Sequence, residues 1–134
     1  MTTDDTMLQS LFVGATGAIL EEKRSGFAKM SLVVRADHLG AGDEVHGGVI
    51  TALMDSTLAI ALRELRGEAA GLHSSIEMNA GFLGSGREGD RITVEGEITH
   101  MSARVAFGEA TVFLQSGEVI AKGRVTFALR QARD

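Results

Sequence analysis

The segment from Gly47 to about Leu65 constrains the fold of this chain more than any other. After the Gly47–Gly48 pair it contains neither glycine nor proline, Ala, Leu and Met dominate it, and basic residues precede the Gly67 that ends it. These features predict a helix with a defined start and stop. Because its apolar side chains fall on every side of the cylinder, we expect a buried helix that the rest of the chain surrounds.

The remainder of the chain is patterned mainly for strands. Alternating apolar and polar residues, bounded by Gly-containing turns, predict strands near 17–23, 27–36, 73–83, 91–101, 104–114 and 119–129. A short amphipathic helix is expected before them, at residues 5–13. No repeat or linker interrupts the pattern. The sequence therefore predicts one α+β domain over residues 1–134, with a largely antiparallel sheet wrapped around the long helix.

Composition excludes several classes of protein. The 134 residues include no cysteine, so disulfide frameworks and thiolate metal sites are excluded. The four histidines show no metal-ligand spacing, which predicts no metal site. No run approaches the roughly 18 apolar residues of a membrane span. The acidic start, MTTDDTMLQS, is unlike a secretory signal. We expect a cytoplasmic protein with no membrane partner.

Charge is unevenly distributed along the chain. The net charge of −5 argues against a nucleic-acid partner. Residues 91–134, however, carry 6 basic and 5 acidic side chains. This third of the chain could offer a cationic patch to a phosphorylated ligand, with Arg104 and Lys122 as candidates. Solvated strand faces are the alternative explanation.

The motif GSGREG at residues 84–89 matches the glycine spacing of a dinucleotide-binding fingerprint. That site needs a helix directly after the glycines, so that phosphate meets a helix N-terminus. Here the strand-like DRITVEGEI follows. We interpret the segment as a hairpin turn and exclude a dinucleotide site.

The stretch EVHGGVITALMD at residues 44–55 has features of a reaction site. Gly47 and Gly48 would present the unpaired amides of a helix start to an anion or a developing oxyanion. Asp55 stands inside an apolar run, where a carboxylate needs a compensating partner. Eight helical residues separate Asp55 from Gly47 by about 12 Å, so one carbonyl carbon cannot contact both. Two antiparallel copies of the helix would bring Asp55 of one chain to Gly47 of the other.

Structural roles remain open for the same residues. His46 could cap the helix or hydrogen-bond a loop carbonyl. Asp55 could pair with Arg66 or with a backbone group and do no chemistry.

The string LGAGDEVHGGVITALMDSTLAIAL resembles the signature of hotdog-fold thioesterases of the phenylacetate-degradation type, in the 4-hydroxybenzoyl-CoA thioesterase superfamily. Two later segments, SIEMNAGFL and SGEVIAKGRVTF, resemble the strand after the family's helix and its closing hairpin. The resemblance covers nearly the whole chain. It implies a hotdog fold, with the antiparallel sheet wrapped around the helix, and a homodimer or a dimer of dimers.

The resemblance also implies an activity, the hydrolysis of an acyl-CoA thioester, with CoA as part of the substrate and no other cofactor. It implies that the Gly47 amide, with Gly48 beside it, polarises the carbonyl, and that Asp55 of the partner chain acts as general base or nucleophile. Ser75 would position water and His46 would orient the thioester. Gly40 stands where the family commonly has a site Asn. The alternatives are a non-catalytic acyl-CoA binder and a thioesterase or hydratase acting on other thioesters, including those of acyl-carrier proteins.

Overall fold

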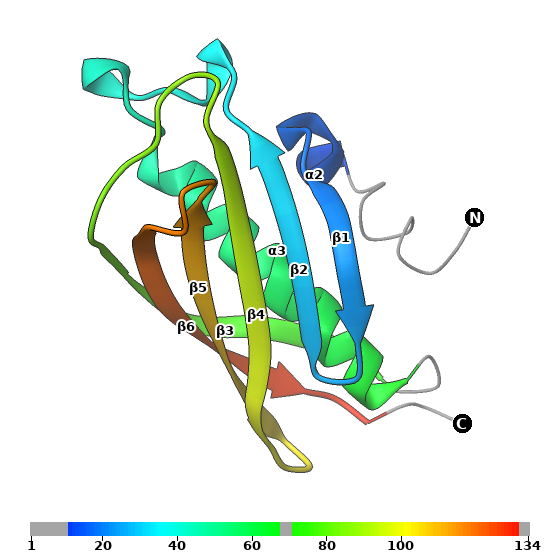
Figure 1. Cartoon of the computed structure of the whole chain (residues 1–134). Coiled ribbons are helices and arrows are strands. Elements are labelled where there is room, and N and C mark those ends of the chain that lie inside the picture. Colours follow the sequence, from blue (N-terminus) through cyan, green and yellow to red (C-terminus); the bar gives the residue numbers. More distant parts are fainter. Residues whose placement is uncertain (1–10, 68–70, 132–134) are drawn as a thin grey trace.

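A computed structural model describes residues 11–67 and 71–131. One curved antiparallel sheet of six strands lies against one long helix, α3 (Figure 1). The helices are α2 (Leu11–Thr16) and α3 (Gly47–Arg66), with short 3₁₀ turns at Ala36–His38 and Ala41–Asp43. The strands are β1 (Ile19–Arg24), β2 (Phe27–Val33), β3 (His73–Phe82), β4 (Arg91–Met101), β5 (Val105–Leu114) and β6 (Val119–Leu129).

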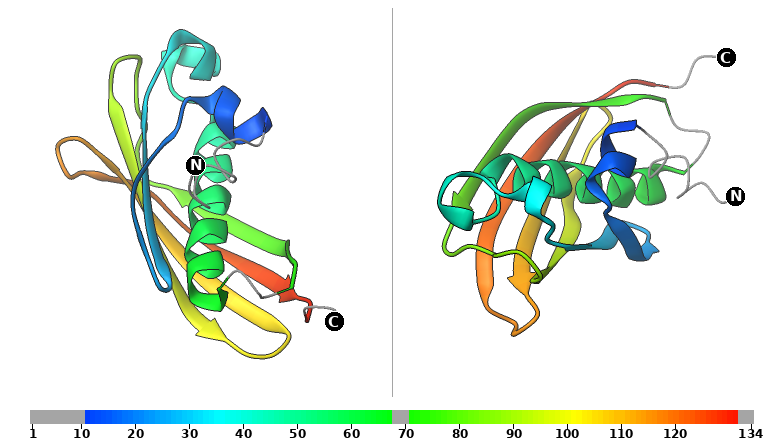
Figure 2. Two further views of the ribbon diagram at one scale, coloured as in Figure 1. Left: turned by 90° about the vertical axis from the view of Figure 1, so that its right-hand side faces the viewer. Right: turned by 90° about the horizontal axis from the view of Figure 1, so that it is seen from above.

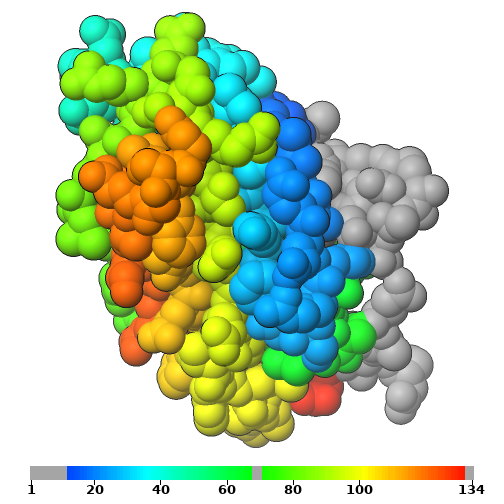
Figure 3. Space-filling model, viewed as in Figure 1, coloured from blue at the N-terminus to red at the C-terminus, as the bar shows by residue number. Residues whose placement is uncertain are grey.

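The sheet follows the order β1-β2-β4-β5-β6-β3, with every pair antiparallel. Seen from the side and from above, α3 lies along the concave face of the sheet (Figure 2). Figure 3 shows the opposite face, where β1, β2, β4 and β5 lie side by side. The expected arrangement of a sheet around a helix is confirmed.

Helix α3 begins and ends where the sequence predicts, within one residue. His46 is its N-cap, and the last turn carries Arg63 and Arg66. Gly67 ends it with a φ of 84° and donates its N–H to the Arg63 carbonyl. A left-handed φ at this position favours glycine, which explains the stop.

One face of α3 is fully buried against the sheet and the opposite face is half-buried. The core between helix and sheet contains large apolar side chains from both layers, among them Leu53, Met54, Leu58, Leu62, Ile92, Val94, Val112 and Phe127. The half-buried face includes Ala52, Asp55 and Ala59. The helix is therefore largely buried, as predicted, with one side left for further contacts.

Glycines on the central strands bring the sheet close to α3. A side chain at Gly108 would begin 2.7 Å from a methyl group of Leu58, and one at Gly96 would begin 2.9 Å from the same methyl group. On β6, a side chain at Gly123 would begin 2.7 Å from the Met54 sulfur. Such contacts are too short for any Cβ, so these glycines permit the close packing of helix on sheet.

Three predictions about local structure need correction. The GSGREG segment is not a hairpin turn: it crosses from β3 at one edge of the sheet to β4 in the middle, because β3 pairs with β6. The strand expected to reach residue 36 ends at Val33, before a 3₁₀ turn. The helix expected at 5–13 lies largely outside the described residues, and the described helix α2 continues to Thr16.

Candidate active site

The start of α3 leaves one backbone amide without a partner. The Gly48 N–H donates to Nδ1 of His46 at 2.8 Å, and the Val49 N–H donates to the His46 carbonyl at 2.9 Å. Within the part of the chain that the structure describes, the Gly47 N–H has no acceptor. The helix dipole adds partial positive charge at this end. Gly47 can therefore donate to an oxyanion, whereas Gly48 serves the cap.

The two glycines of the pair leave different amounts of room for a side chain. A side chain at Gly48 would begin 2.9 Å from Nδ1 of His46 and would displace the imidazole. At Gly47 it would begin 3.3 Å from Cζ of Phe82, at the end of β3. On the other side of the imidazole, a side chain at Gly40 would begin 3.3 Å from Cδ2 of His46. Gly40 and Gly48 thus lie close against the exposed imidazole, and the capping role considered for His46 is confirmed.

Asp55 and Ser75 form a direct pair. Ser75 donates its hydroxyl hydrogen to Oδ1 of Asp55 at 2.6 Å. Asp55 lies on the half-buried face of α3 and Ser75 is exposed on β3. Because a hydroxyl oxygen retains two acceptor lone pairs while it donates, this pair can also hold a water molecule.

The structure does not contain the Asp55–Arg66 pair that was the structural alternative for Asp55. Arg66 donates instead to the carbonyls of Gly71, Leu72 and Arg130. These bonds tie the end of α3 to the entry of β3 and to the segment after β6. Among the described side chains, Ser75 is the hydrogen-bond partner of Asp55.

His73 is a site neighbour that the sequence analysis did not identify. It lies two residues before Ser75 on β3 and packs edge-on against Phe127, with 5.4 Å between ring centroids. Burial lowers the pKa of His73; Arg66 and Arg63 lower it further, and Asp55 raises it. The imidazole is therefore neutral at pH 7. In the sequence, the only indication was the two-residue spacing between His73 and Ser75, which places both side chains on the same face of the predicted strand.

The sequence model of the family described as "Thioesterase superfamily" matches residues 43–121 of this chain. This match includes the helix start, Asp55 and Ser75, and covers more than half of the chain. The chain belongs to the thioesterase superfamily. Two curated relatives carry the name "putative esterase": a Schizosaccharomyces pombe protein, 37% identical over 110 residues, and an Archaeoglobus fulgidus protein, 29% identical over 85 residues. The matches cover 80% and 63% of this chain but 66% and 53% of those relatives.

Solved structures of the superfamily share the fold. The Escherichia coli PaaI protein, from the phenylacetic acid degradation operon, superposes with a TM-score of 0.87 at 20% identity, covering 96% of this chain and 90% of that one. A Streptococcus pneumoniae hypothetical thioesterase, solved with coenzyme A, gives 0.80 at 20% identity, covering 87% and 88%. Zebrafish thioesterase superfamily member 2 gives 0.85 at 22% identity, covering 95% and 93%. The fold is the predicted hotdog fold.

The two residues predicted to bind CoA phosphates lie far apart in this thioesterase-superfamily chain. Arg104 is exposed at the β4–β5 turn, where its carbonyl accepts from the Leu129 N–H. Lys122 is exposed on β6 opposite Gly81. Arg104 is level with Leu129, so about seven strand residues, or roughly 23 Å, separate it from Lys122 along the sheet. Their role in binding phosphate stays a prediction.

Metals and membranes were also part of the sequence predictions. Within residues 11–67 and 71–131, no three His, Asp or Glu side chains gather to hold a metal ion. Across the same ranges, no helix is both long and apolar enough to cross a membrane.

Proposed function

We propose that this protein hydrolyses acyl-CoA thioesters to the free acid and CoA. The observation that carries the proposal is the pairing of Asp55 with Ser75 at 2.6 Å, on the helix whose Gly47 amide is available to an oxyanion. Membership of the thioesterase superfamily supports thioester chemistry. The pneumococcal structure with coenzyme A supports CoA as the leaving group.

The site is proposed to need two copies of the chain. Along one helix, Gly47 and Asp55 are separated by about 12 Å. The two edges of the sheet differ in a way that favours dimerisation through β3. Strand β1, with the sequence ILEEKR, is short and charged, which protects an edge from pairing. Strand β3 has ten residues and exposes Ile76 at 61% and Phe82 at 50%.

Pairing of β3 with a second β3 would complete the site. Gly47 lies against Phe82 near the end of the strand, and Asp55 is bonded to Ser75 near its start. In an antiparallel pair centred on the middle of residues 73–82, Ser75 faces residue 80 of the partner, close to the partner's Phe82. Asp55 of one protomer then lies near the Gly47 amide of the other.

In the proposed reaction, the thioester carbonyl accepts a hydrogen bond from the Gly47 N–H, which stabilises negative charge on its oxygen. Asp55 of the partner acts in one of two ways. As a base it takes a proton from water, and the resulting hydroxide attacks the carbonyl carbon. As a nucleophile it forms an anhydride that water then cleaves. On both routes the C–S bond breaks, the CoA thiolate leaves and takes up a proton, and water supplies the new acid oxygen.

Ser75 and His46 would have supporting roles. Ser75, donating to Oδ1, leaves Oδ2 of Asp55 available to water or carbonyl carbon. His46 accepts at Nδ1 from Gly48, so the proton of the neutral ring is on Nε2. That N–H is a second donor near the helix start and would orient the thioester.

Release of free CoA from a panel of acyl-CoAs, followed with a thiol reagent, tests the proposal. We expect multiple turnovers on at least one acyl-CoA and slower release from the matching acyl-carrier-protein thioester. Gly40, which replaces the Asn common in the family, favours the second candidate, a non-catalytic binder of acyl-CoA. Tight acyl-CoA binding without CoA release across the panel would select the binder.

A further inference from the structure

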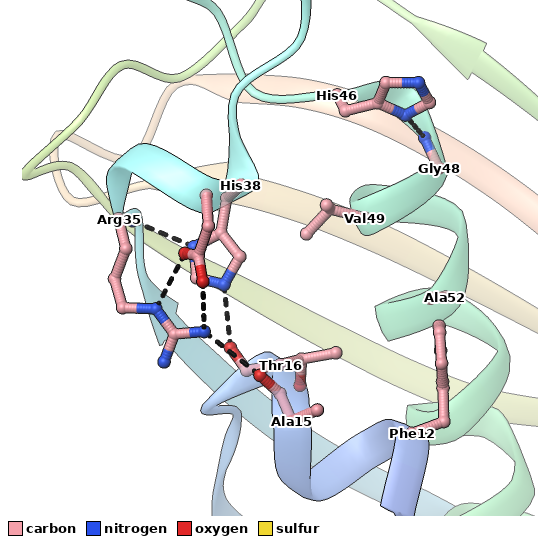
Figure 4. A pocket seen from close by; sticks show the side chains of 10 residues that line it. Phe12, Ala15, Thr16, Arg35, His38, His46, Gly48, Val49 and Ala52 are labelled. Atoms are coloured by element: carbon pink, nitrogen blue, oxygen red, sulfur yellow. Dashed lines mark hydrogen bonds and ion pairs between the residues drawn. The ribbon is translucent and has the colours of Figure 1, made fainter.

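The histidines of this chain differ in what their ring nitrogens bond to. His38 accepts the Arg35 N–H at Nδ1 and donates from Nε2 to the Thr16 carbonyl, each at 2.8 Å. His46 accepts the Gly48 N–H at 2.8 Å and caps α3. Both rings line the cavity between α2 and the start of α3, where their bonds are drawn in Figure 4. These two histidines therefore serve the local backbone.

His73, the first residue of β3, is a half-buried histidine without such a bond. Among the described residues, neither of its ring nitrogens has a hydrogen-bond partner. The ring packs instead against Phe127, which is fully buried. Polar groups that are withdrawn from water without a partner cost free energy and need an explanation. A titratable group of this kind beside a proposed reaction site is a candidate for a role in that site.

His73 and Ser75 lie on the face of β3 that meets α3. Ser75 is the cross-strand partner of Phe127, the residue on which the His73 ring packs. Two residues along a strand are about 6.6 Å apart. The imidazole is thus the next side chain in line from the Ser75 hydroxyl, which donates to Asp55. The three polar side chains form one group, which we call the Asp55 cluster.

Charged side chains of α3 act on the His73 imidazole from two sides. Burial lowers the pKa of His73 most; Arg66 and Arg63, in the last turn of the helix, lower it further, and Asp55 raises it. The contact from β6 is the uncharged Phe127. Arg66 is held in place, because its guanidinium donates to three backbone carbonyls. The surroundings therefore keep the ring neutral at pH 7, although a carboxylate lies within range of it.

The charge on His73 determines what Asp55 is able to do. While the imidazole is neutral, Asp55 has the Ser75 hydroxyl as its partner and keeps one carboxylate oxygen open. A proton on the ring would place a cation next to the carboxylate. The cation would lower the basicity of Asp55, and a charge-assisted hydrogen bond would turn the open oxygen toward the ring. Both effects oppose a base or a nucleophile.

We propose that His73 is a positioning residue for the reaction: the neutral imidazole leaves Asp55 bonded to Ser75 and open to substrate, whereas the imidazolium pairs with Asp55 and removes it from the reaction. The inference rests on the proposed function, because it requires Asp55 to act as base or nucleophile. It adds a third side chain to the Asp55 cluster, and it makes the rate of thioester hydrolysis depend on the charge of a residue that does not touch the substrate.

Two substitutions reproduce the two charge states at a single pH. Gln is uncharged, whereas Lys, with an ordinary pKa of about 10.4, carries a charge. At pH 7.5, His73→Gln should keep kcat within about twofold of the parent value, and His73→Lys should lose about tenfold or more. The KM for acyl-CoA should change by less than about twofold in both. Equal kcat values for the folded Gln and Lys variants would overturn the inference.

The pH dependence of kcat tests the same residue without a fixed charge. In the parent, kcat should fall as the pH drops below about 6.5 and His73 takes up a proton. In His73→Gln the fall should begin at lower pH, because the group that pairs with Asp55 is gone. His100→Gln, which replaces an exposed histidine on β4, should keep the parent profile. Circular dichroism at each pH establishes that the protein is folded. Identical acid limbs in the parent and His73→Gln would contradict the proposal.

Nuclear magnetic resonance separates failure of the inference from failure of the proposed function. The pKa of His73 is measured from its imidazole resonances in the parent and in Asp55→Asn. Because Asp55 favours the charged ring, its neutralisation should lower the pKa of His73 further. A lower pKa in Asp55→Asn would support the pairing of the two residues even if no acyl-CoA were hydrolysed. An unchanged pKa would overturn the inference even in an active thioesterase.

Discussion

At Asp55, a carboxylate lies halfway along a largely buried helix and accepts a hydrogen bond from Ser75. That bond compensates part of the cost of placing a charge there, but only one of the two oxygens is engaged. A residue with a purely structural role would more often have its charge neutralised by a cation, and Arg66, the partner considered for it, is bonded elsewhere. The free oxygen is what a base or a nucleophile requires.

The Asp55→Asn variant tests this assignment. It keeps the shape and the acceptor for Ser75 but removes the base or nucleophile. Turnover of acyl-CoA should fall by about two orders of magnitude or more. Far-ultraviolet circular dichroism and melting temperature should stay close to those of the parent. The control is Asp43→Asn, at an exposed position with φ of 60° that asparagine tolerates. Parent-like turnover by a folded Asp55→Asn protein would remove Asp55 from the chemistry.

His73 makes stability depend on pH. Because burial lowers its folded-state pKa below the unfolded value of about 6.5, the unfolded chain binds more protons in the interval between the two values. Stability from this group is complete above about pH 6.5 and is lost as pH falls toward the folded-state pKa. We expect the melting temperature to decrease from pH 7.5 to 5.5, and His73→Gln to flatten that slope.

The control for the dependence of melting temperature on pH is His100→Gln, which replaces an exposed histidine at the far end of β4. An unchanged slope in His73→Gln, or an equal flattening in His100→Gln, would contradict the assignment to His73.

At the level of elements, the start of α3 combines a cap with an open donor. Pro is well tolerated at the first helical position, since its missing N–H has no helical partner there. The residue before it, His46, already has the extended ψ of 133° that precedes proline. Gly47→Pro should therefore preserve the helix while deleting the N–H that we propose as the oxyanion donor. We expect kcat to fall by about 10²- to 10³-fold, as for loss of an oxyanion donor.

Gly47→Ala is the matched variant, because it adds the same Cβ against Phe82 but keeps the N–H. It should retain most of the activity that Gly47→Pro loses. If both variants lose activity equally, crowding at Phe82 is the cause, and the amide is not the donor.

The elements also show what sequence could and could not predict. The bounds of α3 follow from its glycines and its uninterrupted apolar run, and the strands follow from alternation. The order of the strands does not follow from the sequence, because alternation shows which face of the sheet a side chain lies on but not which strands are neighbours. This is why the prediction of a hairpin turn at GSGREG is wrong. The Asp55–Ser75 bond and the α2–α3 cavity depend on how distant segments pack, and neither has a local signal. For His46, the residues allowed two structural roles, a helix cap or a hydrogen bond to a loop carbonyl, and the cap is the one observed.

At the scale of the whole molecule, the exposed edge of β3 is expected to form a dimer. Light scattering at micromolar concentration should give twice or four times the mass of the chain. Ile76→Lys puts a charge on that edge and should shift the mass toward the monomer and reduce turnover with it. Ile19→Lys, on the already charged β1 edge, should leave the mass unchanged. A fully active monomer would contradict the shared site.

The central claim is that Gly47 of one chain works with Asp55 of another, and subunit complementation tests it most directly. Gly47→Pro and Asp55→Asn chains, carrying different tags, are co-expressed and the mixed dimer is purified. The homodimer of either single variant should be nearly inactive. The mixed dimer contains one site with both groups intact, so it should recover about half of the parent kcat. A mixed dimer as inactive as the two homodimers would show that Gly47 and Asp55 do not act across the interface.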